Sequence, residues 1–214
     1  MANIEHVAKL KEGVEAWNSW RQQNPKIRPD LYRLDLTTAE WKDTTLWDEK
    51  RQALCLFVPH ARSVDEYNSV DQYIKFTAEH TKHIEAINFA NANLESSNFT
   101  NCRLWKVNFR GASMMWSNLV RARCSRADFT DADLGNADLS TADFWAVNLT
   151  GARLSGANFT GTGLKAVIYN RKKMIDRCLG VRSPEQCWGN SLFRRDLQDQ
   201  DIIDTLRKGW RTPW

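Results

Sequence analysis

A repeat of five residues runs through the middle of the chain and constrains its fold more than any other feature. Between residues 84 and 169 every fifth residue is apolar, and the register never breaks. A second column, of smaller residues, lies two positions before each centre and runs from Ala92 to Ala157. The centres are Ile84, Phe89, Leu94, Phe99, Leu104, Phe109, Met114, Leu119, Cys124, Phe129, Leu134, Leu139, Phe144, Leu149, Leu154, Phe159, Leu164 and Tyr169.

A period of five matches neither an α-helix, which repeats every 3.6 residues, nor a β-strand, which repeats every two. The repeat therefore predicts a coil with corners, in which each unit sends its centre and its small residue inward. The residue between these two is usually Asn or Asp. We expect it at the corners, because short amide and carboxylate side chains bond nearby backbone groups and tolerate turn geometry.

The units resemble the A-(D/N)-L-x-x tandem repeats of pentapeptide-repeat proteins, as in Ala127-Asp128-Phe129 and Ala132-Asp133-Leu134. The resemblance covers roughly half of the chain. It implies an all-β solenoid, a right-handed quadrilateral β-helix with four units per coil. Some members of the family resemble duplex DNA, bind DNA gyrase or topoisomerase IV and give resistance to gyrase inhibitors. These members usually form homodimers through their C-terminal ends.

The flanking sequence predicts α-helical caps at both ends of the β-helix, because repeat stacks need capping units to stay soluble. Residues 1–28 are predicted to form an N-terminal capping helix, with Asn3 as its N-cap and Pro25 at its end. Residues 29–48 repeat the five-residue spacing and predict a first coil, with centres at Leu31, Leu36, Trp41 and Leu46.

The register then breaks, which indicates an insertion at 49–82 before the main β-helix at 83–170. The insertion is interpreted either as a binding surface or as an ordered loop packed on the stack. Residues 171–214 predict a C-terminal helical cap that also offers a dimer contact. Cys178 and Cys187 are close in sequence, and whether they pair stays open, since persistent disulfides are rare in the cytoplasm.

Composition and motifs narrow the classes of function. The chain has 214 residues and a net charge of +4, with no apolar run of about 18 residues, so no membrane span is expected. The first residues lack the pattern of a secretory signal, and we expect a cytoplasmic protein. No phosphate-binding loop or activated nucleophile is recognisable, so no enzyme and no cofactor are predicted. His80 and His83 lie beside carboxylates, but no second cluster follows them, and we predict no metal site.

One outward strip of the predicted coil differs from the polar remainder. Because residues twenty apart share a side, basic and aromatic residues gather there, and Trp105 and Trp145 should point outward. Arg and Trp commonly anchor interfaces. The hypothetical binding residues are Arg103, Trp105, Lys106, Arg123, Arg126, Trp145 and Lys165. The alternative, that the rings are covered by the insertion or the C-terminal tail, stays open, and Met115 and Trp116 interrupt the polar surface elsewhere.

The resulting prediction is a non-catalytic β-helix that acts as a rigid protein-binding or scaffold module for an unidentified protein partner. Binding of gyrase or topoisomerase IV is the alternative. Residues 84–169 contain seven acidic and eight basic residues, which is unlike the acidic field of a DNA mimic. A local acidic patch at residues 128–143 remains an open alternative, and nucleic acid is not the predicted partner.

Overall fold

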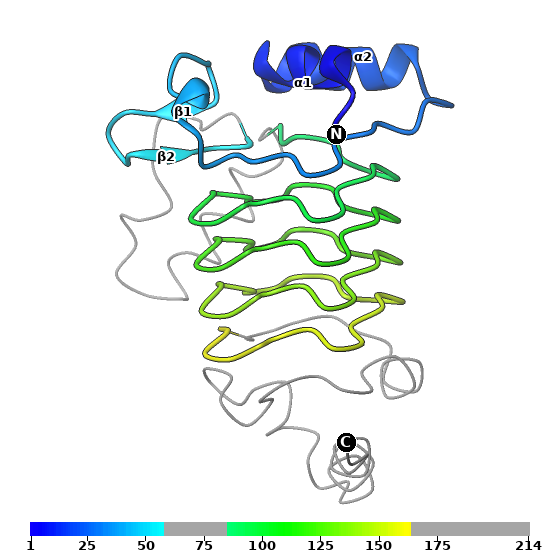
Figure 1. Cartoon of the computed structure of the whole chain (residues 1–214), viewed down its shortest axis with the longest axis vertical. Coiled ribbons are helices and arrows are strands. Elements are labelled where there is room, and N and C mark those ends of the chain that lie inside the picture. The colour runs from blue at the N-terminus through cyan, green and yellow to red at the C-terminus, as the bar shows by residue number, and fades with distance from the viewer. Residues whose placement is uncertain (58–84, 164–214) are drawn as a thin grey trace, which may run out of the picture.

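The computed structural model describes residues 1–57 and 85–163, and its main feature is a stack of coils. Isolated parallel bridges join residues twenty apart, so each coil contains four units (Figure 1). We number the four sides of the stack by the outward residues that these bridges align. The first side has Asp30, Asn93, Ser113, Asp133 and Arg153; the second has Asp35, Asn98, Asn118, Asp138 and Asn158; the third has Cys55, Arg103, Arg123, Asp143 and Gly163; the fourth has Asn88, Asn108, Asp128 and Asn148.

The core lies inside the coils and consists of the two predicted inward columns. The described centres from Phe89 to Phe159 are at most 4% exposed, and the smaller residues from Ala92 to Ala157 are at most 2% exposed. Phenylalanine rings stack through successive coils, with 4.7 Å between the ring centroids of Phe109 and Phe129 and 5.5 Å between those of Phe129 and Phe144. The inward direction of both columns is therefore confirmed for the described units.

The Asn and Asp residues bond the backbone as expected, but they do not take the special backbone conformation at the corner. The side chains of Asn88, Asp128 and Asn158, for example, each accept from the backbone N–H two residues later. The left-handed residue of each unit instead lies two positions after the centre. Arg121, with φ of 56°, and Arg126, with φ of 60°, are examples. The N–H that bonds the side chain therefore lies one position before the left-handed residue.

Two short helices lie across one end of the stack, where a single helix was predicted (Figure 1). Helix α1 spans Ile4–Lys11 and helix α2 spans Val14–Gln23. Asn3 is confirmed as an N-cap, since its side chain accepts from the N–H groups of Glu5 and His6. The break falls at Gly13, which has φ of 107° and lies so close to Thr45 that an added Cβ would be 2.5 Å from its Oγ1.

Helix α2 occupies the edge of the fourth side, where a preceding coil would otherwise pair. Trp17 Nε1 donates to Asn88 O at 2.8 Å, and Arg21 Nη2 donates to Ala90 O at 2.9 Å. Asn18 Oδ1 accepts from Asn88 N at 3.0 Å. In the coils below, backbone groups of the preceding coil make the three equivalent hydrogen bonds. Phe89 N, for example, donates to Asn108 O. Three side chains of one helix therefore replace a missing strand.

The remaining edges of the first coil are also occupied. On the first side Asp30 N donates to His6 Nδ1 at 3.0 Å, and Asp30 O accepts from Asn3 N at 2.9 Å. On the second side Asp35 O accepts from Trp41 Nε1 at 2.8 Å. On the third side Cys55 N donates to Leu46 O at 2.7 Å. Because exposed strand edges recruit other chains, this closure removes the described end as a site of edge pairing.

The first coil is built differently from the predicted unit at 29–48. Its first two units fit the prediction, since Leu31 and Leu36 are buried and Asp30 and Asp35 bridge to the coil below. The chain then forms a 3-10 helix, η1 at Ala39–Trp41, and an antiparallel pair, β1 at Trp47–Asp48 with β2 at Ala53–Leu54. The third unit comes from Cys55, which bridges to Arg103. Trp41 and Leu46 are buried in this excursion rather than in stacked units.

Candidate binding surface

The predicted basic strip lies on the third side of the stack, where the coil brings distant residues into register. Arg103 bridges to Arg123, and Arg123 bridges to Asp143. Residues 85–163 contain seven basic residues, and four of them, Arg103, Lys106, Arg123 and Arg126, belong to this side. Asp143 is the one acidic residue of these third-side units. The sides therefore differ in charge, although residues 85–163 carry seven basic and seven acidic residues in total.

Trp105 is not an outward contact residue, which corrects the prediction for it. Its side chain is 4% exposed and packs with Cys55, Phe57 and Ala86. The rings of Phe57 and Trp105 meet edge to face, with 5.7 Å between their centroids. The segment that precedes the described gap therefore covers this tryptophan, and the ring stabilises the molecule internally.

Arg103 is also largely buried, since it is 9% exposed. Burial opposes ionisation of the nearby Asp48 carboxyl, but hydrogen bonds from Arg51 and the charges of Arg51 and Arg103 lower the pKa of Asp48 overall. Asp48 also accepts from Arg51 Nη1 at 2.5 Å. Arg103 thus contributes to a charge cluster beneath β1 rather than to an outer surface.

The lower third side, which contains Lys106, Arg123, Arg126 and Trp145, keeps the predicted combination of basic and aromatic groups. The guanidinium of Arg126 lies over the ring of Trp145, 5.2 Å from its centroid. Trp145 is half-buried, and its backbone N–H donates to Asp143 Oδ1 at 3.1 Å. Arg123 is exposed. The pKa of Lys106 is lowered, first by burial and then by the charge of Arg126. Lys165 lies outside the described residues.

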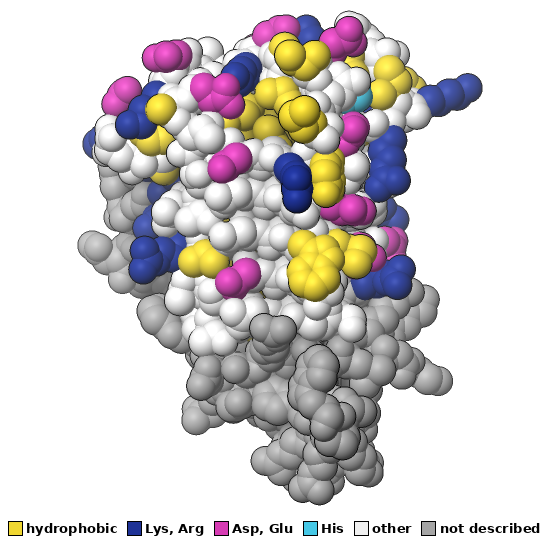
Figure 2. Space-filling model, in the orientation of Figure 1, with side chains coloured by type: hydrophobic (Ala, Val, Ile, Leu, Met, Phe, Trp, Pro, Cys, Tyr) yellow, Lys and Arg dark blue, Asp and Glu magenta, His cyan; other side chains and the backbone are white. Residues whose placement is uncertain are grey.

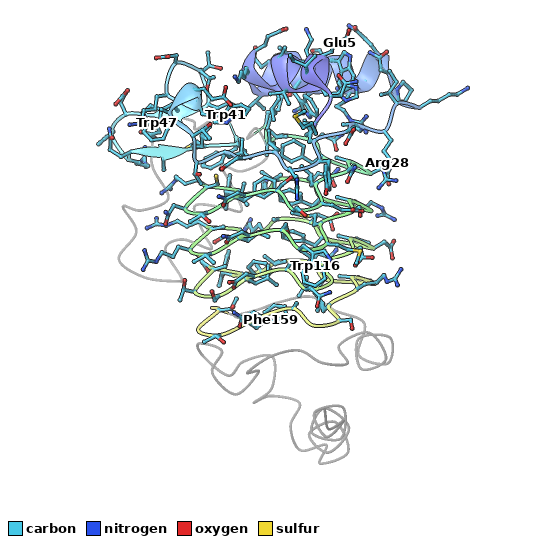
Figure 3. The ribbon with its side chains drawn as sticks, in the orientation of Figure 1. Glu5, Arg28, Trp41, Trp47, Trp116 and Phe159 are labelled. Atoms are coloured by element: carbon cyan, nitrogen blue, oxygen red, sulfur yellow. The ribbon has the colours of Figure 1, made fainter. Side chains whose placement is uncertain are left out.

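Trp116 forms a second feature, which the sequence marked as unusual but which was not included in the predicted site. It is 63% exposed and lies partway along the stack (Figure 3). The space-filling view shows a hydrophobic patch at this level, on a surface of mainly uncharged groups (Figure 2). Its sequence signal was its place in an outward position that other units fill with polar or small residues.

The acidic residues between 128 and 143 do not form one patch. Asp128 is aligned on the fourth side, Asp133 on the first, Asp138 on the second and Asp143 on the third. Successive units turn by one side, so residues five apart point in different directions. The local acidic patch that the sequence left open for these residues is therefore not formed, because close spacing in sequence does not bring them together in space.

Neither a metal site nor an activated thiol is present in the part of the chain that the structure describes. Its His, Cys, Asp and Glu residues form no group of three suited to a metal ion. His80 and His83 lie outside the described residues. Burial raises the pKa of the Cys55 thiol to about 11, and burial also raises the pKa values of Cys102 and Cys124, which opposes formation of a reactive thiolate at each of them. Neither described helix is long and apolar enough to span a membrane.

Comparison with protein families matches residues 82–165 to the family described as "Pentapeptide repeat region". Residues 82–165 are a pentapeptide repeat region. Proteins of this family fold as right-handed quadrilateral β-helices and generally serve as structural or binding modules without catalytic activity. The stacking of residues twenty apart in the repeat region agrees with four units per coil.

Solved structures with pentapeptide repeats resemble parts of this chain. A pentapeptide repeat protein from the thylakoid lumen of Arabidopsis thaliana is 23% identical, with a TM-score of 0.31, over 44% of this chain and 81% of that chain. Rfr23 from the cyanobacterium Cyanothece 51142 is 29% identical, with a TM-score of 0.27, over 40% of this chain and 58% of that one. QnrB1, a plasmid-mediated fluoroquinolone resistance protein, is 22% identical, with a TM-score of 0.22, over 43% and 55%. No curated protein gives a significant match.

Proposed function

We propose that this chain is a non-catalytic, right-handed quadrilateral β-helix that acts as a rigid protein-binding or scaffold module. Its repeat region supports this proposal, because the inward columns fill the coil completely and leave functional variation to outward side chains. Stacked repeats offer extended surfaces whose residues are held in fixed register by the backbone. Such a surface binds a partner without needing to order itself first, which reduces the entropic cost of association.

The contact surface that we propose is the lower third side, formed by Lys106, Arg123, Arg126 and Trp145. The observation that carries it is the Arg126 guanidinium over the Trp145 ring, 5.2 Å from the ring centroid. Arg and Trp are the residue types most enriched at interface positions that dominate binding energy. Positive charge on two successive coils favours a partner that presents an acidic segment, because complementary charge directs association and excludes basic partners.

Site-specific photo-crosslinking in cells of the source organism tests this surface. The photoreactive residue p-benzoylphenylalanine is placed at position 145, or at Ser140 as the matched control. Both positions directly follow a buried centre, but Ser140 belongs to the second side. We expect a partner to crosslink from position 145 and not from position 140. Equal crosslinking from both positions would contradict a binding surface confined to the third side.

The identified partner is then titrated against purified variants. Arg126→Glu should weaken binding by at least about tenfold, or about 1.4 kcal/mol. Arg121→Glu is the control, since Arg121 and Arg126 occupy the same left-handed position on adjacent sides. Equal losses in both variants would overturn the proposal. If the crosslinked partner is a subunit of gyrase or topoisomerase IV, the alternative function is the correct one.

A further inference from the structure

Trp116 combines exposure with a backbone conformation that bulky residues rarely adopt. Among the described residues, four large hydrophobic side chains are exposed, and Trp116 is the aromatic one. Its φ is 61°, in the left-handed region where a bulky side chain is strained. Its neighbour Met115 lies over Gly135, since a Cβ added to Gly135 would be 3.7 Å from Met115 Cε. An apolar patch is therefore held outward at some cost in stability.

We propose that this surface is the contact between two copies of the chain. We define the Trp116 flank as the outward positions of the first side, one before, one after and two after each buried centre. In the proposed dimer two flanks face each other with their stacks antiparallel. The two-fold axis lies in the contact plane, perpendicular to the stack, at the level of Trp116. Each of the three columns of outward residues therefore faces the same column of the second copy in reverse order. Trp116 faces Trp116 of the second copy. Isologous contacts of this kind require a self-complementary surface.

The charges of the Trp116 flank satisfy that requirement. Asp30 lies two coils from Trp116 toward the N-terminal end of the stack, and Arg153 lies two coils from Trp116 toward the other end. The reversal places Asp30 of each copy opposite Arg153 of the other. The Nε of Arg153 lies 3.6 Å from Asp133 Oδ2 of the same chain, but the Arg153 side chain is 68% exposed and can still reach a second molecule. One coil from the axis, Asn93 meets Asp133, so the column before the centres places no like charges opposite each other, and Arg33 and Glu95 lie in the other two columns.

The sizes of the turn residues are complementary about the same axis. One coil above Trp116 is Glu95, which accepts from Ser113 Oγ at 2.6 Å, and one coil below is Gly135, beside which Met115 lies, so the longer side chain meets a position that has no side chain of its own. At the next level Tyr32 meets Ser155. In the column that directly follows the centres, the bulky residues Tyr32 and Glu95 lie on the N-terminal half and the small residues Gly135 and Ser155 on the other half. An antiparallel pair therefore interlocks, whereas a parallel pair would set Glu95 against Glu95.

The size of the contact sets the expected affinity. Coils repeat at about 4.8 Å, so the five aligned levels span roughly 20 Å. A contact strip of this length and only one coil side wide buries less than the roughly 800 Å² per partner of a standard stable interface. We therefore expect reversible association in the micromolar range, centred on the paired Trp116 rings, and not an obligate dimer.

Sedimentation equilibrium of the full chain tests the proposal between about 1 and 200 μM. We expect a monomer–dimer equilibrium for the wild type and a dissociation constant raised roughly tenfold or more by Trp116→Ala. Trp145→Ala, on the third side, should leave the dissociation constant unchanged. A chain that sediments as a monomer throughout overturns the proposal, and so does a dimer unaffected by Trp116→Ala.

A charge exchange tests the antiparallel arrangement. Arg153→Glu and Asp30→Lys should each weaken the homodimer, because each sets like charges opposite one another at both ends. An equimolar mixture of the two variants should form a heterodimer, since both charge pairs become attractive again. A mixture that associates no better than its components contradicts the arrangement. If Asp30→Lys does not fold, Trp116→Cys serves instead: oxidation should produce a disulfide-linked dimer that the wild type does not form, and its absence overturns the proposal.

Discussion

The Asn18 side chain is expected to stabilise the N-terminal end of the stack by replacing one peptide group of a missing coil. Its Nδ2 donates to Ala86 O at 2.9 Å and to Glu85 Oε1 at 2.8 Å, while its Oδ1 accepts from Asn88 N at 3.0 Å. Asn18 is 8% exposed, so water cannot readily replace these bonds. Asn18→Leu keeps a similar volume but removes both the donor and the acceptor.

The magnitude follows from the groups left without partners. Two backbone groups, Ala86 C=O and Asn88 N–H, lose their bonds to the Asn18 amide. An unsatisfied buried polar group costs about 1–3 kcal/mol, and partial access to water at the edge reduces that cost. We therefore expect Asn18→Leu to lower the free energy of unfolding by about 2–4 kcal/mol.

Urea unfolding followed by far-ultraviolet circular dichroism measures this loss, and amide hydrogen exchange locates it. Exchange at Asn88 N–H should accelerate markedly, because Asn18 Oδ1 is its acceptor. Gln22→Ala is the matched control: Gln22 is exposed on the same helix, so its replacement should change stability by no more than about 0.5 kcal/mol. A loss in Asn18→Leu no larger than in this control, with Asn88 exchange unchanged, would refute the replacement of a peptide group by the Asn18 amide.

Four further outcomes are expected. Phe129→Ala should lower the free energy of unfolding in urea by about 3–5 kcal/mol, because Phe129 is fully buried between two stacked rings, and wild-type stability would contradict this packing. Trp116→Gly should raise it by about 1 kcal/mol at concentrations where the chain is monomeric, since relief of the left-handed strain, about 1–3 kcal/mol, exceeds the roughly 0.5–1 kcal/mol entropic cost of glycine. Gly151→Ala should lower the melting temperature, with a loss of about 1–3 kcal/mol, because Gly151 has φ of 73° and an added Cβ would fall on the Asp131 side chain. Burial raises the pKa of Cys55 from 9.0 to about 11, so the folded state keeps a proton that the unfolded state loses. The contribution of Cys55 to stability should therefore be lost between pH 9 and about 11, and Cys55→Ser should reduce that part of the pH dependence.

Much of the coil was predictable because its core is specified locally. Each centre and each small residue is a fixed number of positions from the next, and one backbone conformation repeated every five residues sends both inward. The grouping of Arg103 with Arg123 followed from the same arithmetic, since they are twenty residues apart. The same arithmetic places the carboxylates at 128, 133, 138 and 143 on different sides, as the structure has them.

The first coil was predicted less well because four matches of spacing carry little information. Trp41 and Leu46 satisfy both the period and the requirement for burial, yet η1 and the β1–β2 pair contain or border them. The unit that completes the third side comes from Cys55, which lies outside the predicted coil. A period cannot reveal where the chain leaves the stack and returns, because that choice depends on pairing with a coil far along the sequence.

The sequence by itself determined the coil, its inward columns and the side to which each outward residue of the repeat belongs. Only the tertiary structure decided which outward residues are covered. Trp105 and Trp116 both occupy outward positions after their centres, but Trp105 is 4% exposed beneath Phe57 and Trp116 is 63% exposed. The physical reason is that the repeat fixes local backbone geometry, whereas burial of an outward side chain depends on a segment about fifty residues away in the chain.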